Sequence, residues 1–431
     1  MQRELKLFGV SLHYKACSIY KICILMFPMK KVYIIDARRS AIGKFLGSLY
    51  EADASDVCSQ IIRNGFDNKL FKDIDIVVLG NVISAGGGQG LARKIAIKAG
   101  IPTEIPAYSL NMVCGSGMEA VRNGVLEIQC GSNLVLAGGF ELMSNIPFAT
   151  NTYMRLGKKF GDFVMTDLMT HDGLIDSLSG VHMGITAENI ARKYKISREE
   201  QDEYALLAQK RAVEAVDGSY FKNEIVPVSL TDYRGNRFVF DKDEFPRRDT
   251  SMDKLSKLKP TFLKDGTGTV TAGNTSGIND GAAFMLLASE DYCKAHGIAP
   301  AAEIIDTAVI GCDPQYMGLG PYYAIAKLIR NSGIEFKDID YFEINEAFAA
   351  QVLGSVKLLA DDFCVTPEYI IDRCNVWGSG LGLGHPLGMT GARIVGTLSH
   401  VLKARNGTFG VASLCIGGGM GAAVLIKRAG E

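Results

Sequence analysis

Three reactive side chains of this 431-residue chain each stand in a glycine-rich turn. They are Cys114 in NMVCGSG, His385 in GHPLG and Cys415 in CIGGGMG. Because glycine has no side chain, a thiol followed by glycines can be approached closely by a substrate. Strand-like runs over 107–113 and 408–414 precede the two cysteines. Both sulfurs are therefore expected at strand ends, where α/β proteins keep their chemistry.

Cys114 is the better candidate for a nucleophile. Apolar residues follow it at helical spacing over 118–128, so we expect Cys114 at the N-terminus of a helix. The unpaired N–H groups and the dipole at that position favour the thiolate, which is the reactive form. His385 also lies in a loop that leads into a helical pattern, and Cys with His is a known nucleophile and base pair. Taken alone, Cys114 would more often be a buried inert thiol, and His385 could equally be a structural histidine.

In this order, the three turns resemble those of the thiolase family, and most closely the biosynthetic acetyl-CoA acetyltransferases. The resemblance extends from about Lys31 to Ala429. Four further stretches carry it: GGFELMS at 138–144, HMGITAEN at 182–189, TVTAGNTSG at 269–277 and NEAFA at 345–349.

The resemblance implies an α/β protein with the thiolase fold, in which two duplicated βαβ-type halves form a five-layer α/β/α/β/α sandwich with an inserted loop domain. The chain carries its own sign of duplication, because FKDID at 71–75 recurs letter for letter at 336–340. Each copy precedes a strand-like run, and further along comes a reactive residue in a glycine turn, followed by a helix. Two such halves facing each other would bring the turns together.

The expected domains follow from these patterns. The N-terminal half comprises residues 29–145 with 277–298, and the C-terminal half comprises 299–431. Residues 146–276 form the loop domain, in which Ser197 and Glu200 form a capping box for a helix that ends at Gly218. Residues 1–28 are expected to be an extension outside the fold. The protein starts at Met1 or Met29, and the strand-like sequence after Met29 favours the second.

The resemblance also implies a role for each reactive residue. Cys114 would carry the acetyl group, His385 would be the base that activates it, and Cys415 would act first as an acid and then as the base that removes an α-proton. One oxyanion hole would combine His385 with a water held by Asn345. The other would use the backbone N–H groups of Cys114 and Gly417.

The predicted substrate is a small-molecule acyl-CoA, with no separate cofactor required. By resemblance, coenzyme A would be bound by His182, Met183, Arg247, Ser276, Ala347 and Phe348. The family likeness also implies a homotetramer, a dimer of dimers.

The composition of the chain argues against several other classes of protein. A net charge of −1 gives no electrostatic case for nucleic-acid binding. The apolar run over 22–27 is too short to cross a bilayer. Ten cysteines without paired spacing indicate reduced thiols, so a cytoplasmic location is expected, and the chain has no zinc-binding motif.

Two other functions compete with an acetyl-CoA acetyltransferase. A degradative 3-ketoacyl-CoA thiolase would use the same machinery on longer chains. A non-catalytic coenzyme A-binding scaffold would need no nucleophile, and the presence of Cys114, His385 and Cys415 together argues against it.

Overall fold

The computed structural model describes residues 5–7, 10–12, 29–232 and 234–430. Most of the predicted extension, 1–28, lies outside the described residues. Its described part is an antiparallel pair, β1 (Leu5–Leu7) and β2 (Val10–Leu12). Among the described helices, none is both long and apolar enough to cross a membrane.

Two sets of strands follow the same topology. In the N-terminal half, the sheet order is β6 (Ala107–Leu110), β5 (Ile76–Gly80), β7 (Leu134–Leu142), β12 (Asn279–Ser289) and β3 (Val32–Arg39). In the C-terminal half it is β14 (Ile339–Ile344), β15 (Phe409–Ile416), β16 (Met420–Arg428) and β13 (Ala302–Gly311). We leave aside the two-residue strand β4 (Gly43–Lys44), which pairs with β12, and number the strands of each half along the chain. Their order across the sheet is then the same in both halves: third, second, fourth, fifth, first. In the second half that third position is held by Cys374, which bridges in parallel to Phe342.

The duplicated FKDID motif has the same structural role in both halves. The Asp75 carboxylate accepts hydrogen bonds from the N–H groups of Asn133 and Leu134, at the start of β7. The Asp340 carboxylate accepts from the N–H groups of Thr408 and Phe409, at the start of β15. The matching topology and the matching hydrogen bonds confirm the predicted duplication.

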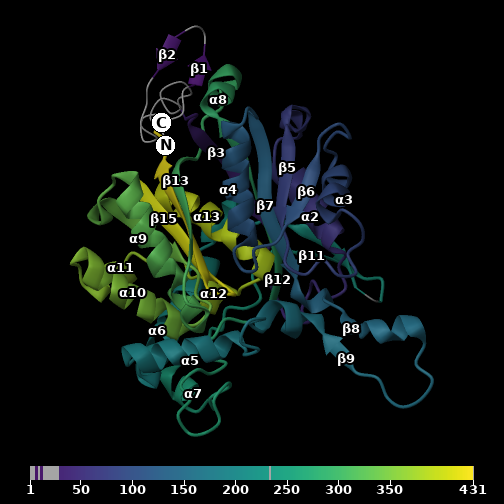
Figure 1. The fold of residues 1–431 in the computed structure, drawn as a ribbon, viewed down its shortest axis with the longest axis vertical. Helices are drawn as coiled ribbons and strands as arrows, with labels where there is room; N and C mark the ends of the chain where they lie inside the picture. The colour runs from purple at the N-terminus through teal and green to yellow at the C-terminus, as the bar shows by residue number, and fades with distance from the viewer. Residues whose placement is uncertain (1–4, 8–9, 13–28, 233, 431) are drawn as a thin grey trace.

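Helices complete five layers around these strands (Figure 1). Between the two halves lie α4 (Ser116–Gln129) and α13 (Leu387–Ala404). The outer face of the N-terminal half is covered by α2 (Ala54–Gly65) and α3 (Leu91–Ala99). The outer face of the C-terminal half is covered by α9 (Gly320–Ser332) and α10 (Ala349–Phe363). The antiparallel pairing of β3 with β13 over 302–304 joins the halves edge to edge.

The burial pattern of β12 shows why helices cover both faces of the sheet. All of β12 is buried, because its two faces meet different helices. Phe284 and Leu286 pack with the outer helices, whereas Met285 and Leu287 pack with the central ones. A strand covered on both faces reads as a continuous apolar run rather than an alternating one.

The segment between β7 and β12 holds α5 (Met183–Tyr194), α6 (Arg198–Asp217) and α7 (Met252–Ser256), with two small hairpins, β8 (Phe148–Thr150) with β9 (Met165–Asp167) and β10 (Val228–Thr231) with β11 (Arg237–Phe240). The capping box predicted for α6 is confirmed, because Ser197 and Glu200 each bond the other's backbone N–H. Shorter helices are α8 (Glu290–His296), α11 (Pro367–Ile371) and α12 (Gly380–Leu383).

Glycines let the central helices meet the sheet at very short range. A Cβ atom added at Gly117 would lie 2.6 Å from the carbonyl oxygen of Gly388, and one at Gly139 would overlap with the same oxygen. Gly117 is in α4, Gly139 in β7 and Gly388 in α13. This three-glycine contact therefore sets how closely the two helix N-termini approach each other.

We expect Gly139→Ala to destabilise the fold by about 2 kcal/mol or more, because the new methyl group meets backbone that cannot rotate away. Chemical denaturation followed by circular dichroism measures the change. Gly311→Ala is the matched control, since a Cβ there would meet its nearest atom only at 3.9 Å. Equal stability of the two variants would contradict the proposed contact.

Candidate active site

Cys114 follows a strained turn that side chains hold in place. β6 ends at Leu110, three residues earlier than the strand pattern predicts, because Val113 has a φ of 47°. The left-handed region is unfavourable for a β-branched residue. Asn111 accepts a hydrogen bond from the Val113 N–H at 2.8 Å, and Ser116 accepts one from the Met112 N–H at 2.9 Å. Cys114 thus lies next to Gly115, the N-cap of α4, at the helix N-terminus as predicted.

Burial sets the protonation state of Cys114. Its pKa is raised to about 11, first by burial, and the N–H of Gly417, directed at the sulfur, opposes this only in part. This shift opposes the prediction that the helix N-terminus favours the thiolate, because desolvation outweighs the backbone N–H groups of Gly417 and Cys114. Burial also raises the pKa of Cys415 well above its usual value, with a further contribution from Cys114. Both sulfurs are thiols in this state.

His385 precedes α13, and its ring is oriented by Thr390. Nδ1 lies 2.7 Å from the Thr390 hydroxyl oxygen, and that hydroxyl donates its own proton to the carbonyl of Pro386 at 2.8 Å. Thr390 must therefore accept from Nδ1–H, which leaves Nε2 as the unprotonated nitrogen. The pKa of His385 is lowered to about 3, first by burial and then by Arg393. The ring is therefore neutral, and its Nε2 has a lone pair that can accept a proton during the reaction.

Two asparagines also surround His385. The amide nitrogen of Asn345 lies 3.4 Å from each ring nitrogen. The Asn345 side-chain oxygen is buried and has no hydrogen-bond donor in the part of the chain that the structure describes. The Asn279 side chain accepts from the His385 N–H at 3.1 Å and donates to the Gly43 carbonyl at 2.9 Å. The loop is thereby attached to the N-terminal half.

One pocket contains the three reactive side chains. Cys114 comes from the N-terminal half, and His385 and Cys415 come from the C-terminal half. All six predicted coenzyme-binding residues line the same pocket: His182, Met183, Arg247, Ser276, Ala347 and Phe348. Asn345 lies beside His385 rather than on the pocket wall, and Gly417 lies next to Met183 and Val113.

The aromatic wall of the pocket centres on Phe262. The His182 ring stacks on Phe262 with centroids 4.7 Å apart, and Phe348 meets Phe262 edge-on at 6.2 Å. Nδ1 of His182 accepts from the Gly184 N–H at 3.0 Å, and burial lowers its pKa, so the neutral ring presents Nε2–H as a donor. Arg247 is exposed and lies over the Phe245 ring. Its cation is therefore available to a phosphate.

Sequence reasoning missed several residues of this site. Thr390 stands in the first turn of α13, and only the fold shows that its hydroxyl meets the imidazole. Phe262 lies in an irregular segment without a helix or strand pattern. Leu174 and Met317 also line the pocket, and neither belongs to a quoted motif. In the described residues, no group of three or more His, Cys, Asp or Glu side chains is placed to hold a metal ion.

Comparison with known families assigns the chain. Residues 32–291 match the thiolase N-terminal domain, and residues 298–428 match the thiolase C-terminal domain. The chain belongs to the thiolase family. Among relatives of this thiolase, an acetyl-CoA acetyltransferase of Chromobacterium violaceum is 44% identical, covering 92% of this chain and 100% of the relative. An acetyl-CoA acetyltransferase of Escherichia coli is 42% identical, covering 93% and 100%.

Solved structures agree with the family. A Bacillus anthracis acetyl-CoA acetyltransferase has a TM-score of 0.86 and 40% identity, covering 93% of this chain and 99% of that one. Human mitochondrial 3-ketoacyl-CoA thiolase has a TM-score of 0.85 and 39% identity, covering 93% and 100%. The predicted fold class is therefore confirmed.

The lowered pKa of His385 predicts an acid-sensitive contribution to stability. A histidine has a pKa near 6.5 when unfolded and about 3 here. The neutral ring therefore stabilises the fold above about pH 6.5, and that stabilisation is lost as the pH falls toward 3. We expect the stability difference between wild type and His385→Asn to shrink by up to about 1.4 kcal/mol per pH unit in this window. Denaturant titrations from pH 7 to 4 measure it, and a constant difference would contradict the expectation.

Proposed function

We propose that this thiolase is an acetyl-CoA C-acetyltransferase, which condenses two acetyl-CoA molecules to acetoacetyl-CoA and coenzyme A. The single observation that carries the proposal is that two thiols and one imidazole with a free Nε2 line one pocket. The names of the most similar relatives support acetyl-CoA as the substrate. The reaction is a reversible acyl transfer. Its first half exchanges one thioester for another, and its second half converts the acetyl-cysteine thioester into a carbon–carbon bond and a free thiol.

In the first half-reaction, the Cys114 sulfur attacks the carbonyl carbon of acetyl-CoA while its proton passes to Nε2 of His385. The bond to the coenzyme A sulfur then breaks, and the departing thiolate takes a proton from the Cys415 thiol. This leaves an acetyl-Cys114 thioester, a cationic His385 and a Cys415 thiolate. Because the pKa of both thiols is raised, transfer of the first proton must accompany substrate attack rather than precede it.

In the second half-reaction, the Cys415 thiolate removes an α-proton from another acetyl-CoA. The resulting enolate attacks the acetyl carbon on Cys114 and forms the new carbon–carbon bond. The Cys114 thiolate leaves and recovers its proton from His385. Every group then returns to its starting protonation state.

Both steps place negative charge on a thioester oxygen, so each needs fixed donors. The Gly417 N–H already points to the Cys114 sulfur and would serve one oxyanion hole with the Cys114 N–H. For the other, we propose His385 and a water on Asn345. The unpartnered Asn345 oxygen supports this, because it supplies an acceptor for such a water.

Coenzyme A would extend from the reactive centre to Arg247. Met183 and Ala347 would line the acyl and pantetheine end, with Phe348 against the pantetheine. His182 would donate from Nε2, and Ser276 would hydrogen-bond the pantetheine amides. Exposed Arg247 would meet the phosphorylated nucleotide. No separate cofactor takes part in this scheme.

A degradative 3-ketoacyl-CoA thiolase is the second candidate, favoured by the similarity to the human mitochondrial enzyme. We expect turnover of acetoacetyl-CoA to exceed that of a medium-chain 3-ketoacyl-CoA by about 10-fold or more, since extra methylenes must fit the pocket. Thiolysis assays over acyl-chain length measure the ratio.

The same assay on Cys114→Ala should show a loss of roughly 10⁴-fold or more. Activity that persists in this variant would overturn the mechanism, and preference for the medium chain would transfer the assignment to the second candidate. A wild-type protein that binds coenzyme A without turnover would instead support the scaffold.

We also propose a cytoplasmic homotetramer. The eight cysteines that the structure describes are free thiols, which suits a reducing compartment. The segment around β8 and β9 projects from the body (Figure 1), and several of its apolar side chains are exposed. Leu156 is 82% exposed and Phe160 is 90% exposed, so this segment has the character of a subunit contact.

Phe160→Asp combined with Leu156→Asp should therefore convert the tetramer into dimers, because a desolvated carboxylate cannot pack in an apolar contact. Sedimentation velocity measures the change. Val239→Asp, at another apolar side chain that is 58% exposed, is the control and should leave the tetramer intact. A wild-type monomer would refute the oligomer proposal.

A further inference from the structure

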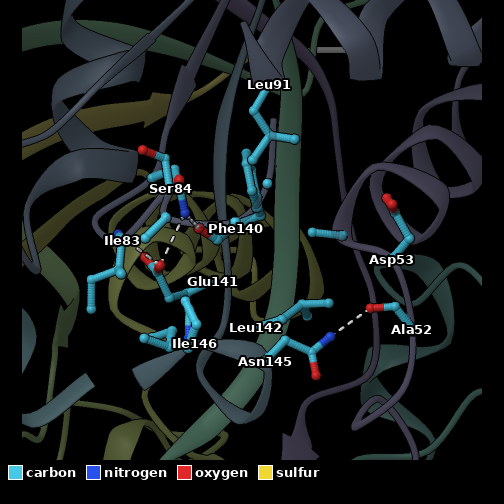
Figure 2. Close-up of a pocket in the computed structure, with 16 residues that line it drawn as sticks. Ala52, Asp53, Ile83, Ser84, Leu91, Phe140, Glu141, Leu142, Asn145 and Ile146 are labelled. Carbon is cyan, nitrogen blue, oxygen red and sulfur yellow. Dashed lines mark hydrogen bonds between the residues drawn. The ribbon is translucent and has the colours of Figure 1, made fainter. Parts of the chain in front are cut away.

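Glu141 is a buried carboxylate that the proposed mechanism does not use. It stands in β7 and is 1% exposed. Figure 2 shows it in a second pocket, next to Ile83 and Ser84, with none of the reactive residues in the wall of that pocket. Burying an ionisable group is costly, so each of its contacts needs an explanation.

Four donors converge on this one carboxylate. The Val82 N–H donates to Oε2 at 2.9 Å, the Ile83 N–H to Oε1 at 3.1 Å and the Asn81 side-chain amide to Oε1 at 2.9 Å. The fourth donor is the N–H of Gly388, 3.0 Å from Oε2. Three contacts thus lie within the N-terminal half, and the fourth crosses to the C-terminal half.

The crossing contact reaches the His385 loop. Gly388 follows His385 by three residues and lies in the first turn of α13. A negative charge at the N-terminus of an 18-residue helix is also favoured by the helix dipole. The Glu141 carboxylate therefore links the end of β7, which neighbours Cys114, to the first turn of α13, which follows His385.

We propose that Glu141 is a positioning residue for acyl transfer, which holds the His385 loop in register with the Cys114 turn through Gly388. This proposal rests on the roles proposed above for Cys114 and His385. A glutamine at this position has one acceptor oxygen instead of two. The glutamine oxygen can accept hydrogen bonds from Asn81 and Ile83. Its amide nitrogen then faces the N–H groups of Val82 and Gly388, and two donors cannot bond each other.

Burial raises the pKa of Glu141 to about 7, although the four donors oppose the shift, and its ionised form makes the smallest contribution to the raised pKa of Cys114. Contact with the base loop and electrostatic contact with the nucleophile arise from the same side chain. The geometry alone carries the proposal, since a displacement of the imidazole of the order of 1 Å reduces rates strongly.

The test is the single-turnover rate constant for acetylation of Cys114 by acetyl-CoA, followed by intact-protein mass. A loss of folded protein lowers the amplitude but leaves this rate constant unchanged. We expect Glu141→Gln to lower the rate constant roughly 10- to 100-fold at an amplitude that matches its folded fraction. A wild-type rate constant in Glu141→Gln would overturn the proposal.

Asp75→Asn is the matched control, because Asp75 is a carboxylate that accepts two backbone N–H bonds at the opposite end of β7. Its rate constant should stay within about 2-fold of wild type. If Glu141→Gln does not fold, Glu141→Asp replaces it. Its carboxylate is one methylene shorter and cannot reach both Val82 and Gly388, so a wild-type rate constant there also overturns the proposal. Wild-type protein that is never acetylated would refute the proposed function instead.

Discussion

The structure depends on one close approach, in which the start of α4, the end of β7 and the start of α13 meet through Gly117, Gly139 and Gly388. Each of these helices begins just after a reactive residue, Cys114 or His385. A Cβ atom at Gly117 or Gly139 would lie closer to the Gly388 carbonyl oxygen than van der Waals contact allows, so the elements would have to move apart. Glycine is required here because backbone meets backbone, rather than for its flexibility.

That close approach also explains the electrostatics of the site. Residues from both halves and from the inserted segment surround the reactive groups, which leaves Cys415 and His385 buried and Cys114 half-buried in the pocket wall. Desolvation raises the pKa of both cysteines and lowers that of His385, and the neutral form of each group results. A neutral pair gains charge only during the reaction, where fixed N–H donors are already in place.

The duplication produces two halves with the same topology, and corresponding positions in the two halves carry different reactive residues. Asp75 and Asp340 still start equivalent strands with equivalent hydrogen bonds. The first half carries Cys114 before its central helix, and the second half carries His385 at the corresponding place. The inserted segment adds Phe262, the centre of the aromatic wall, which has no counterpart in either half.

The sequence by itself determined the reactive trio, the repeat, the capped helix α6 and the family, because each depends on residues close together along the chain or on their order. Only the tertiary structure decided the protonation states and the partners of the base. The N–H directed at the Cys114 sulfur belongs to the distant Gly417, and Glu141 meets Gly388 across 247 residues. Local sequence patterns do not show which distant segments of the chain contact or bury a given side chain. The start of α4 therefore predicted a thiolate, whereas burial by the assembled fold produced a thiol.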